Sequence, residues 1–140
     1  MLTVQLGDQT AGLVGYSGYW LIAGEAHVST IAVSPTWRGR GLGELLLLNM
    51  LLTAYRQAAL LATLEVRKGN LVAQALYQKY RFEIVGERPR YYQGKEDALL
   101  MTVEPLDRAY RSFLGNMQES LFRRLEFDSR RESTPVISKK

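Results

Sequence analysis

The chain has 140 residues, of which 46% are hydrophobic, and carries a formal net charge of +4 with one histidine and no cysteine. This length and apolar content support one compact domain with a real core, and not two. One histidine and no cysteine leave too few ligands for a metal site and exclude most nucleophilic triads. The sequence shows neither a signal peptide nor a membrane-spanning run, so we expect a cytoplasmic protein.

The first part of the sequence predicts an antiparallel meander of strands. Apolar and polar residues alternate near Thr3–Leu6, Gly12–Ala23 and Ala26–Val33, which is the pattern of half-buried strands. The single histidine, His27, falls within the third of these strands. We expect it at the surface beside a neighbouring strand, without a catalytic role.

A glycine-rich turn follows the third strand and leads into a leucine-rich helix expected over Leu42–Gln57. Its glycines are Gly39, Gly41 and Gly43. Their backbone N–H groups can converge on an anion at the helix N-terminus, where the helix dipole favours negative charge. Because Glu44 follows the last glycine, a Walker loop is excluded, and the spacing does not fit the dinucleotide fingerprint. The turn therefore predicts a pyrophosphate cradle or an ordinary glycine-capped helix.

The next part of the chain alternates between strands and a helix. Strands are expected over Ala62–Val66, Arg81–Gly86 and Ala98–Val103, and a helix over Leu71–Lys79. The apolar Ala62–Val66 segment suits a central, buried strand. Together with the meander, these elements predict an α+β fold, in which helices flank a mixed and mostly antiparallel sheet.

Three motifs in this order resemble those of the GCN5-related N-acetyltransferase (GNAT) family. Residues 38–43 match its acetyl-CoA-binding pattern R-x-x-G-x-G. Residues 65–82 match E-V-R-x-x-N-x-x-A-x-x-L-Y-x-x-x-G-F, except that Arg81 replaces the usual glycine. Arginine reaches the left-handed conformation of that glycine only at some cost, so we expect a changed turn there and not a lost site. Residues 90–101 resemble the R-x-Y-Y…E-D-A-I-I-M ending of the RimI-type branch, the bacterial ribosomal-protein alanine N-acetyltransferases. The resemblance covers residues 2–106.

The resemblance implies an acetyl-CoA-dependent N-acetyltransferase. It implies that Glu65 is the general base for the amine and that Tyr77 is the general acid for the coenzyme A thiolate. From the residues alone, Glu65 also fits a solvated strand end, Tyr77 a core position and Asn70 a helix N-cap. The implied cofactor contacts are Ile31, Ala32, Val33, Arg38, Gly39, Arg40, Gly41, Leu42, Gly43, Glu44 and Asn70.

The RimI-type ending implies a protein acceptor, namely the N-terminal α-amine of a ribosomal protein that begins with alanine. Tyr91, Tyr92 and Asp97 are candidates to hold the acceptor peptide, although hairpin tyrosines also serve packing alone. Two alternatives remain open. One is acetylation of a small amine or a lysine, and the other is a non-catalytic module that binds coenzyme A or a protein partner.

The domain limits follow from where the resemblance ends. We expect an acetyltransferase domain over residues 1–106, shortened at its front relative to the family. Without the family's first strand and two helices, an unprotected sheet edge would offer a route to a dimer. An amphipathic helix is expected over residues 107–128, since apolar residues recur there at helical spacing: Tyr110, Phe113, Leu114, Met117 and Leu121.

The last part of the chain carries most of the net positive charge, +3 of +4. Residues 107–140 hold eight Lys or Arg against five Asp or Glu. We expect a docked helix followed by a disordered tail over residues 129–140. The charge also suits a contact with ribosomal RNA or another acidic partner, but only through this segment.

Overall fold

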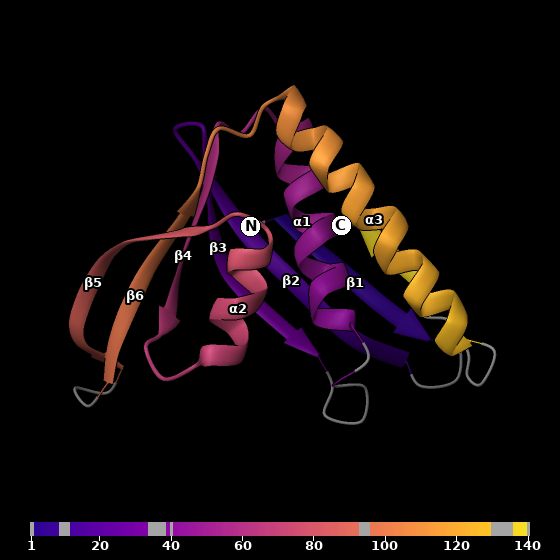
Figure 1. The fold of residues 1–140 in the computed structure, drawn as a ribbon, viewed down its shortest axis with the longest axis horizontal. Helices are drawn as coiled ribbons and strands as arrows, with labels where there is room; N and C mark the ends of the chain where they lie inside the picture. The colour runs from indigo at the N-terminus through magenta and orange to yellow at the C-terminus, as the bar shows by residue number, and fades with distance from the viewer. Residues whose placement is uncertain are drawn as a thin grey trace.

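The computed structural model describes residues 2–8, 12–33, 39, 41–92, 96–129 and 136–139. One seven-stranded sheet, in the order β5-β6-β4-β3-β2-β1-β7, is covered by three helices (Figure 1). Among its strand pairs only β3 and β4 run parallel, so the predicted mixed, mostly antiparallel sheet is confirmed. The elements are β1 (Leu2–Asp8), β2 (Gly12–Ile22), β3 (Glu25–Val33), α1 (Leu42–Arg56), β4 (Leu61–Arg67), α2 (Leu71–Lys79), β5 (Glu83–Tyr92), β6 (Glu96–Val103), α3 (Arg108–Ser129) and β7 (Val136–Lys139).

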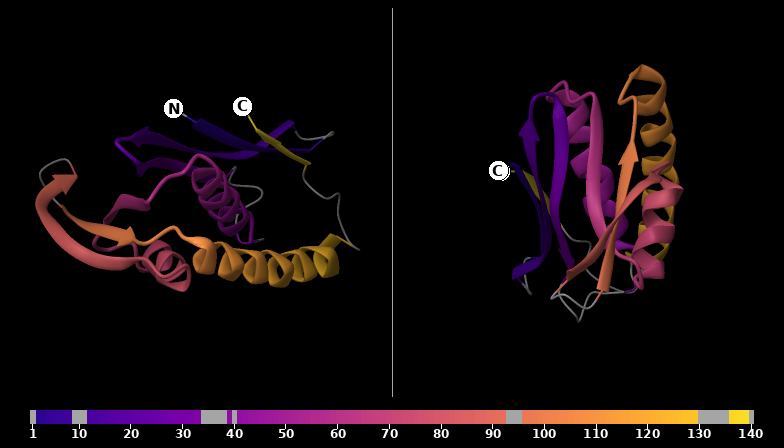
Figure 2. Two further views of the ribbon diagram at one scale, coloured as in Figure 1. Left: turned by 90° about the horizontal axis from the view of Figure 1, so that it is seen from above. Right: turned by 90° about the vertical axis from the view of Figure 1, so that its left-hand side faces the viewer.

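The helix α1 lies inside the molecule and not on its surface. Its leucines are buried on nearly every side, because β1–β3 cover one side and α3 covers another (Figure 2). A helix that is apolar all round is typical of such an interior position. The hydroxyl of Ser17 on β2 donates to the carbonyl oxygen of Leu46 at 3.4 Å, which ties the sheet to α1. No helix in the described part of the chain is long and apolar enough to cross a membrane.

The helix α3 closes the core from the other side. Asp107 caps its N-terminus, since the Asp107 carboxylate accepts from the backbone N–H of Tyr110 at 2.9 Å. Leu114 and Leu121 are fully buried, and the hydroxyl of Tyr110 donates to the carbonyl oxygen of Tyr80 at 2.8 Å. Burial of these apolar side chains is what holds α3 to the rest of the domain.

The end of the chain differs from the sequence prediction. Residues 129–140 are predicted to be disordered, whereas Val136–Lys139 forms β7, antiparallel to β1. Two β-branched residues begin β7, and an edge strand such as β1 presents unpaired backbone groups that favour such pairing. The edge expected to be unprotected is thereby paired over Val4–Gly7, which removes that part of the argument for a dimer.

The pairing between β3 and β4 is unusually short. In the described strands, the two pair only over Glu25–His27 and Leu61–Thr63. Beyond Thr63, β4 continues to pair with β6 on its other side, while β3 continues to pair with β2. The sheet therefore opens between β3 and β4.

Candidate active site

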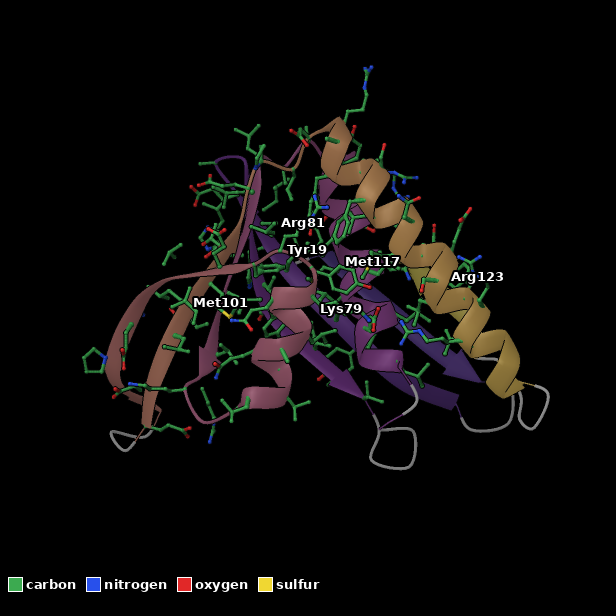
Figure 3. All side chains as sticks on the ribbon, viewed as in Figure 1. Tyr19, Lys79, Arg81, Met101, Met117 and Arg123 are labelled. Atoms are coloured by element: carbon green, nitrogen blue, oxygen red, sulfur yellow. The ribbon has the colours of Figure 1, made fainter. Side chains whose placement is uncertain are left out.

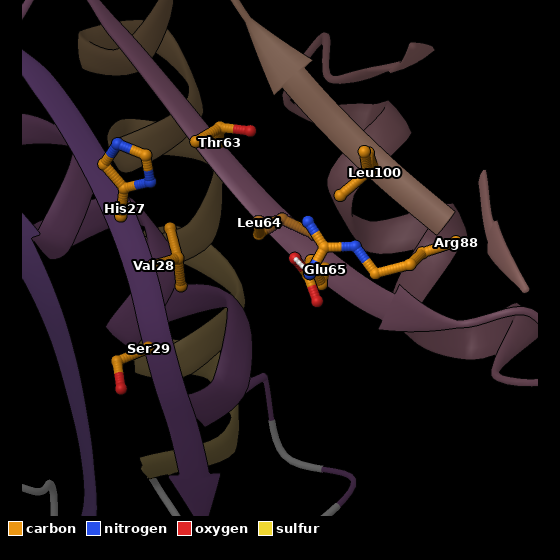
Figure 4. Close-up of a pocket in the computed structure, with 8 residues that line it drawn as sticks. All are labelled: His27, Val28, Ser29, Thr63, Leu64, Glu65, Arg88 and Leu100. Atoms are coloured by element: carbon orange, nitrogen blue, oxygen red, sulfur yellow. Dashed lines mark ion pairs between the residues drawn. The ribbon is translucent and has the colours of Figure 1, made fainter. Parts of the chain in front are cut away.

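Two pockets meet in the opening between β3 and β4. The first, about 560 Å³, is lined by strand residues, and among the described ones these include His27, Thr63 and Arg88 (Figure 4). The second, about 550 Å³, is lined also by α2. The residues shared by the two pockets are Val28, Ser29, Leu64 and Glu65. A group that reacts in this opening can therefore be approached from either pocket.

Glu65 is the ionisable residue common to both pockets. It lies on β4 between Leu64 and Val66, whose side chains are buried in the core. Its Oε1 atom forms an ion pair with Arg88 of β5, at 3.1 Å from the guanidinium nitrogen. Its Oε2 atom is buried and has no hydrogen-bond partner among the described residues. A buried acceptor without a donor is costly, and it marks a place where a ligand or a water can donate.

Tyr77 lies on α2 and lines the second pocket together with Asn70 and Ala73. The Asn70 side chain caps α2, because its Oδ1 atom accepts from the backbone N–H of Ala73 at 3.1 Å. The N-cap role expected for Asn70 is thus present, and the residue also lines the pocket. The structure brings Glu65, Asn70 and Tyr77 together around one opening.

The end of α2 fixes the position of Tyr77. The backbone N–H of Phe82 donates to the carbonyl oxygen of Tyr77, and that of Arg81 donates to Gln78. This is the hydrogen-bond pattern of a Schellman motif, which requires a left-handed residue after the helix. Arg81 takes that conformation with φ 70°, so the turn keeps the left-handed form and the changed turn expected at Arg81 is not found. Its guanidinium lies 3.8 Å from the centre of the Phe113 ring on α3, a contact that offsets part of the strain.

The glycine turn before α1 has the backbone geometry of an anion cradle. Gly39 and Gly41 have φ near +80°, a conformation that glycine adopts readily. A Cβ atom placed on Gly39 or Gly43 would meet none of the described residues within 4 Å, so these residues leave space open beside the start of α1. Gly41 is the N-cap residue, and no side chain there caps the helix. Arg38 and Arg40, the expected positive charges, lie outside the described residues.

The side chains of Leu42 and Glu44 point into the protein. Leu42 is buried in the core. The Glu44 carboxylate accepts from Tyr80 at 2.7 Å, from Lys79 at 2.9 Å and from Arg124 of α3 at 3.1 Å. Figure 3 shows Lys79 on the side of α2 that faces α1. Only the backbone of Leu42 and Glu44 therefore suits the cofactor contacts that the resemblance implies.

The charge of Glu44 is held inside the protein by these partners. Burial raises the pKa of a carboxyl group, but here the Tyr80 and Lys79 hydrogen bonds and the charges of Lys79 and Arg124 outweigh burial. The pKa of Glu44 is lowered below its ordinary value. In turn, burial and the hydrogen bond to Glu44 raise the pKa of Tyr80. The network joins α1, α2 and α3 just behind the glycine turn.

The strand segment Ile31–Val33 pairs with Gly15–Ser17 of β2. The resemblance implies a bulge at this segment, whereas the register shift lies between Gly18 and Tyr19 and leaves Ser29 of β3 as the extra residue. The irregularity thus falls two residues before Ile31, at a residue that lines both pockets. Ile31 lines the second pocket, so this part of β3 does border the opening.

The candidate acceptor residues are less clearly grouped. Tyr91 and Tyr92 belong to β5, and their side chains lie outside the described ones. Asp97 is at the start of β6, where its carbonyl oxygen accepts from the backbone N–H of Lys68 at 3.0 Å. It is not among the residues that line either pocket.

Arg88 is the functional candidate that the motifs do not reveal. Arg88 on β5 contacts Glu65 on β4 because both strands are neighbours of β6 in the sheet. No local pattern in the sequence specifies this strand order. The sequence of β5 does not indicate which residue Arg88 contacts across the sheet.

Comparison with known proteins identifies the family. The model of the "Acetyltransferase (GNAT) family" matches residues 1–82, more than half of the chain. The chain belongs to the GNAT acetyltransferase family. This agrees with the fold, because the match includes the glycine turn, Glu65, Asn70 and Tyr77 in one continuous stretch.

Several GNAT proteins of one branch are similar to this chain. A protein of Bacillus subtilis (strain 168), provisionally named a [ribosomal protein bS18]-alanine N-acetyltransferase, is 39% identical over 97 residues, covering 69% of this chain and 64% of its own length. The [ribosomal protein bS18]-alanine N-acetyltransferase of Salmonella typhimurium (strain LT2) is 36% identical over 59% of this chain and 58% of its own length. This chain thus spans less than two thirds of both relatives.

A solved structure shows the same fold at a comparable level of identity. The crystal structure of the ribosomal-protein-S18-alanine N-acetyltransferase from Escherichia coli superposes with a TM-score of 0.65 and 30% identity. The match covers 70% of this chain and 65% of that one. The GNAT fold predicted from the three motifs is therefore confirmed.

Proposed function

We propose that this GNAT protein transfers the acetyl group of acetyl-CoA to the N-terminal α-amine of a protein. The proposed acceptor class is a ribosomal protein that begins with alanine, and a ribosomal acceptor would place the reaction in the cytoplasm. The observation that carries the proposal concerns the Oε2 atom of Glu65, which is buried, has no hydrogen-bond partner in the described part of the chain, and lies where the two pockets meet. The names of the similar proteins support the acceptor class.

The residues around the second pocket fit acetyl-CoA. When bound, acetyl-CoA supplies an acetyl group that is activated as a thioester. The amides at the start of α1 and the space beside Gly39 and Gly43 suit its pyrophosphate. Ile31 and the exposed Asn70 line the second pocket, which its pantetheine arm would enter.

Glu65 is suited to take the proton of the amine. Its Oε1 atom is already paired with Arg88, so Oε2 is the oxygen available to an incoming N–H group. Tyr77, at the other side of the shared opening, is suited to donate its phenolic proton to the departing thiolate. General acid–base assistance of this kind contributes about 10²–10⁴-fold to a rate.

The chemistry of the amine favours a chain terminus over a lysine. An α-amine has a pKa near ~8, so about a tenth of it is neutral at pH 7. A lysine has a pKa near ~10.4, so only about one molecule in two thousand is neutral at that pH. A carboxylate with one free oxygen is a weak base, and it is better matched to the α-amine.

The test is acetyl transfer to a panel of acceptors, followed by mass spectrometry. The panel holds short peptides with different N-termini, a lysine peptide with a blocked N-terminus, and a polyamine. We expect transfer to the alanine N-terminus, a loss of about 10²–10⁴-fold in Glu65→Gln, and acetyl-CoA binding that calorimetry finds unchanged in that variant. Glu87→Gln is the matched control, because Glu87 is paired with Lys68 outside both pockets.

Each alternative has its own result in this experiment. Faster transfer to the polyamine or the lysine peptide would replace the α-amine with a side-chain or small-molecule acceptor. Binding of acetyl-CoA without transfer to any amine would indicate a non-catalytic module. Full activity in Glu65→Gln would contradict the assignment of the base.

A further inference from the structure

Arg88 reaches Glu65 across a complete strand. Glu65 is on β4 and Arg88 is on β5, and β6 lies between them with Leu100 directly opposite Glu65. Leu100 lines the same pocket, and Gly86 of β5 pairs with it on the other side. The Arg88 side chain therefore extends over Leu100 to place its guanidinium 3.1 Å from Glu65 Oε1 (Figure 4).

The backbone of β5 is adjusted where this contact is made. Its register against β6 shifts between Ile84 and Gly86 and again between Arg88 and Tyr92. Irregularities of this kind redirect side chains and are enriched beside active sites. At Gly86 a Cβ atom would lie 3.2 Å from Leu100 Cδ1, so the strand packs closely on Leu100 just before Arg88. The two shifts bracket Arg88.

The ion pair gives the two oxygens of Glu65 different roles. Oε1 is paired with a guanidinium, whereas Oε2 is buried and faces no donor among the described residues. A free carboxylate rotates about its last bond and exchanges its oxygens, but a carboxylate held at one oxygen keeps the other in a fixed place. Preorganised orientation of this kind is worth a large factor in rate, because a misplacement of about 1 Å can cost about 10²-fold.

We propose that Arg88 is a positioning residue for Glu65: its guanidinium holds Oε1 of Glu65 so that Oε2 points to the incoming amine. This inference rests on the proposed function, since it assigns Arg88 a role only if Glu65 is the base. Arg88 acts through Glu65 and does not itself exchange a proton with the amine. A lysine is a poor substitute, because its ammonium is a point charge on a flexible stem without the planar fork of a guanidinium.

The decisive experiment is a double-mutant cycle on transfer to the alanine peptide. We expect Arg88→Gln to lower kcat by about 10–100-fold while the KM for acetyl-CoA stays within about twofold. In a Glu65→Gln background, the same change should cost no more than about twofold, since the group that Arg88 positions is already absent. Arg88→Lys should recover part of the lost kcat.

Lys68→Gln is the matched control. It removes one positive charge from an ion pair with β5 at 2.8 Å that is outside both pockets, and it should leave kcat unchanged. Thermal unfolding of all variants checks that they fold, and if Arg88→Gln does not, Arg88→Lys in both backgrounds replaces it in the cycle.

The outcomes separate this inference from the proposed function. If Glu65→Gln is inactive while Arg88→Gln keeps the full rate, Arg88 positions nothing and only the inference fails. If the two losses add in full, Arg88 contacts the acceptor independently of Glu65, which also overturns the inference. If Glu65→Gln itself retains the rate, the proposed base fails and the inference fails with it.

Discussion

Tyr77 and Phe82 hold each other at the end of α2. The backbone N–H of Phe82 donates to the carbonyl oxygen of Tyr77 at 3.0 Å, and their rings are 5.7 Å apart with a 55° tilt. The hydroxyl group of Tyr77 takes no part in either contact. The packing of this side chain and its proposed chemistry are therefore separable by removing one oxygen atom.

The variant Tyr77→Phe tests this separation. We expect kcat to fall by about 10²–10⁴-fold if the hydroxyl group protonates the thiolate, while the variant stays folded because the ring still packs on Phe82. Steady-state kinetics and thermal unfolding give the two readouts. A variant as active as the parent protein would show that Tyr77 has a packing role alone.

Gly43→Ala tests the open space beside α1. In the described part of the chain, a Cβ atom at this position meets nothing within 4 Å, and alanine is favoured over glycine in a helix by about 1 kcal/mol. We therefore expect the free energy of unfolding to stay level or rise by up to about 1 kcal/mol. If the pyrophosphate of acetyl-CoA lies beside Gly43, the added methyl group should nonetheless weaken the affinity for acetyl-CoA, as measured by calorimetry. Unchanged binding would place the pyrophosphate elsewhere.

Glu44→Gln should expose the contribution of the buried network. It removes the charge that accepts from Tyr80, Lys79 and Arg124, so we expect a loss of about 1.5–3 kcal/mol in the free energy of unfolding at pH 7. Glu119→Gln on the exposed side of α3 is the control, and it should change little. Denaturation by urea, followed by circular dichroism, measures both variants.

The pH dependence of this stabilisation follows from the lowered pKa of Glu44. Because the pKa in the folded protein lies below the ordinary value of 4.5, the stabilisation is fully present above about pH 4.5 and is lost as the pH falls through the folded value. Below pH 4.5, the free energy of unfolding of the parent protein should therefore fall toward that of Glu44→Gln. A difference that stays constant down to pH 2 would contradict the role of the charge.

Arg81 offers a comparison of backbone strain with side-chain packing. Arg81→Ala keeps the left-handed φ and loses the contact with Phe113, so we expect it to destabilise the fold by about 0.5–1 kcal/mol. Arg81→Gly loses the same contact but relieves a strain of about 1–2 kcal/mol, of which a more flexible unfolded chain cancels about 0.4–1 kcal/mol. It should therefore be more stable than Arg81→Ala. Urea denaturation that ranks the two in the opposite order would exclude strain at this position.

Local sequence patterns were sufficient for the parts of the site that lie close together in the chain. Glu65, Asn70 and Tyr77 fall within one strand, turn and helix, so their spacing places them around one opening once the elements form. The turn at Arg81 was predicted wrongly as changed, because the hydrogen bonds at the end of α2 and the contact with Phe113 keep the left-handed conformation there. The leucine-rich run after the glycine turn predicted α1, and the alternation of apolar and polar residues predicted most of the strands.

Long-range contacts were not predictable in this way. The partner of Arg88 depends on the strand order and on two register shifts in β5. The network around Glu44 needs three helices in their final positions, and Arg124 lies 80 residues from Glu44 in the chain. The pairing of β7 with β1 joins segments at opposite ends of the chain, so no local window contains both partners.

The pairing between β3 and β4 is short, so few backbone hydrogen bonds hold these two strands together. Three residues on each side join the strands there, and beyond them the halves β7-β1-β2-β3 and β4-β6-β5 part. In the complex that we propose, acetyl-CoA would lie in the opening between β3 and β4 and contact both halves of the sheet. Amide hydrogen exchange at the facing edges of β3 and β4 should then slow when acetyl-CoA binds. The bound cofactor, and not the protein chain alone, would then join the two halves of the sheet.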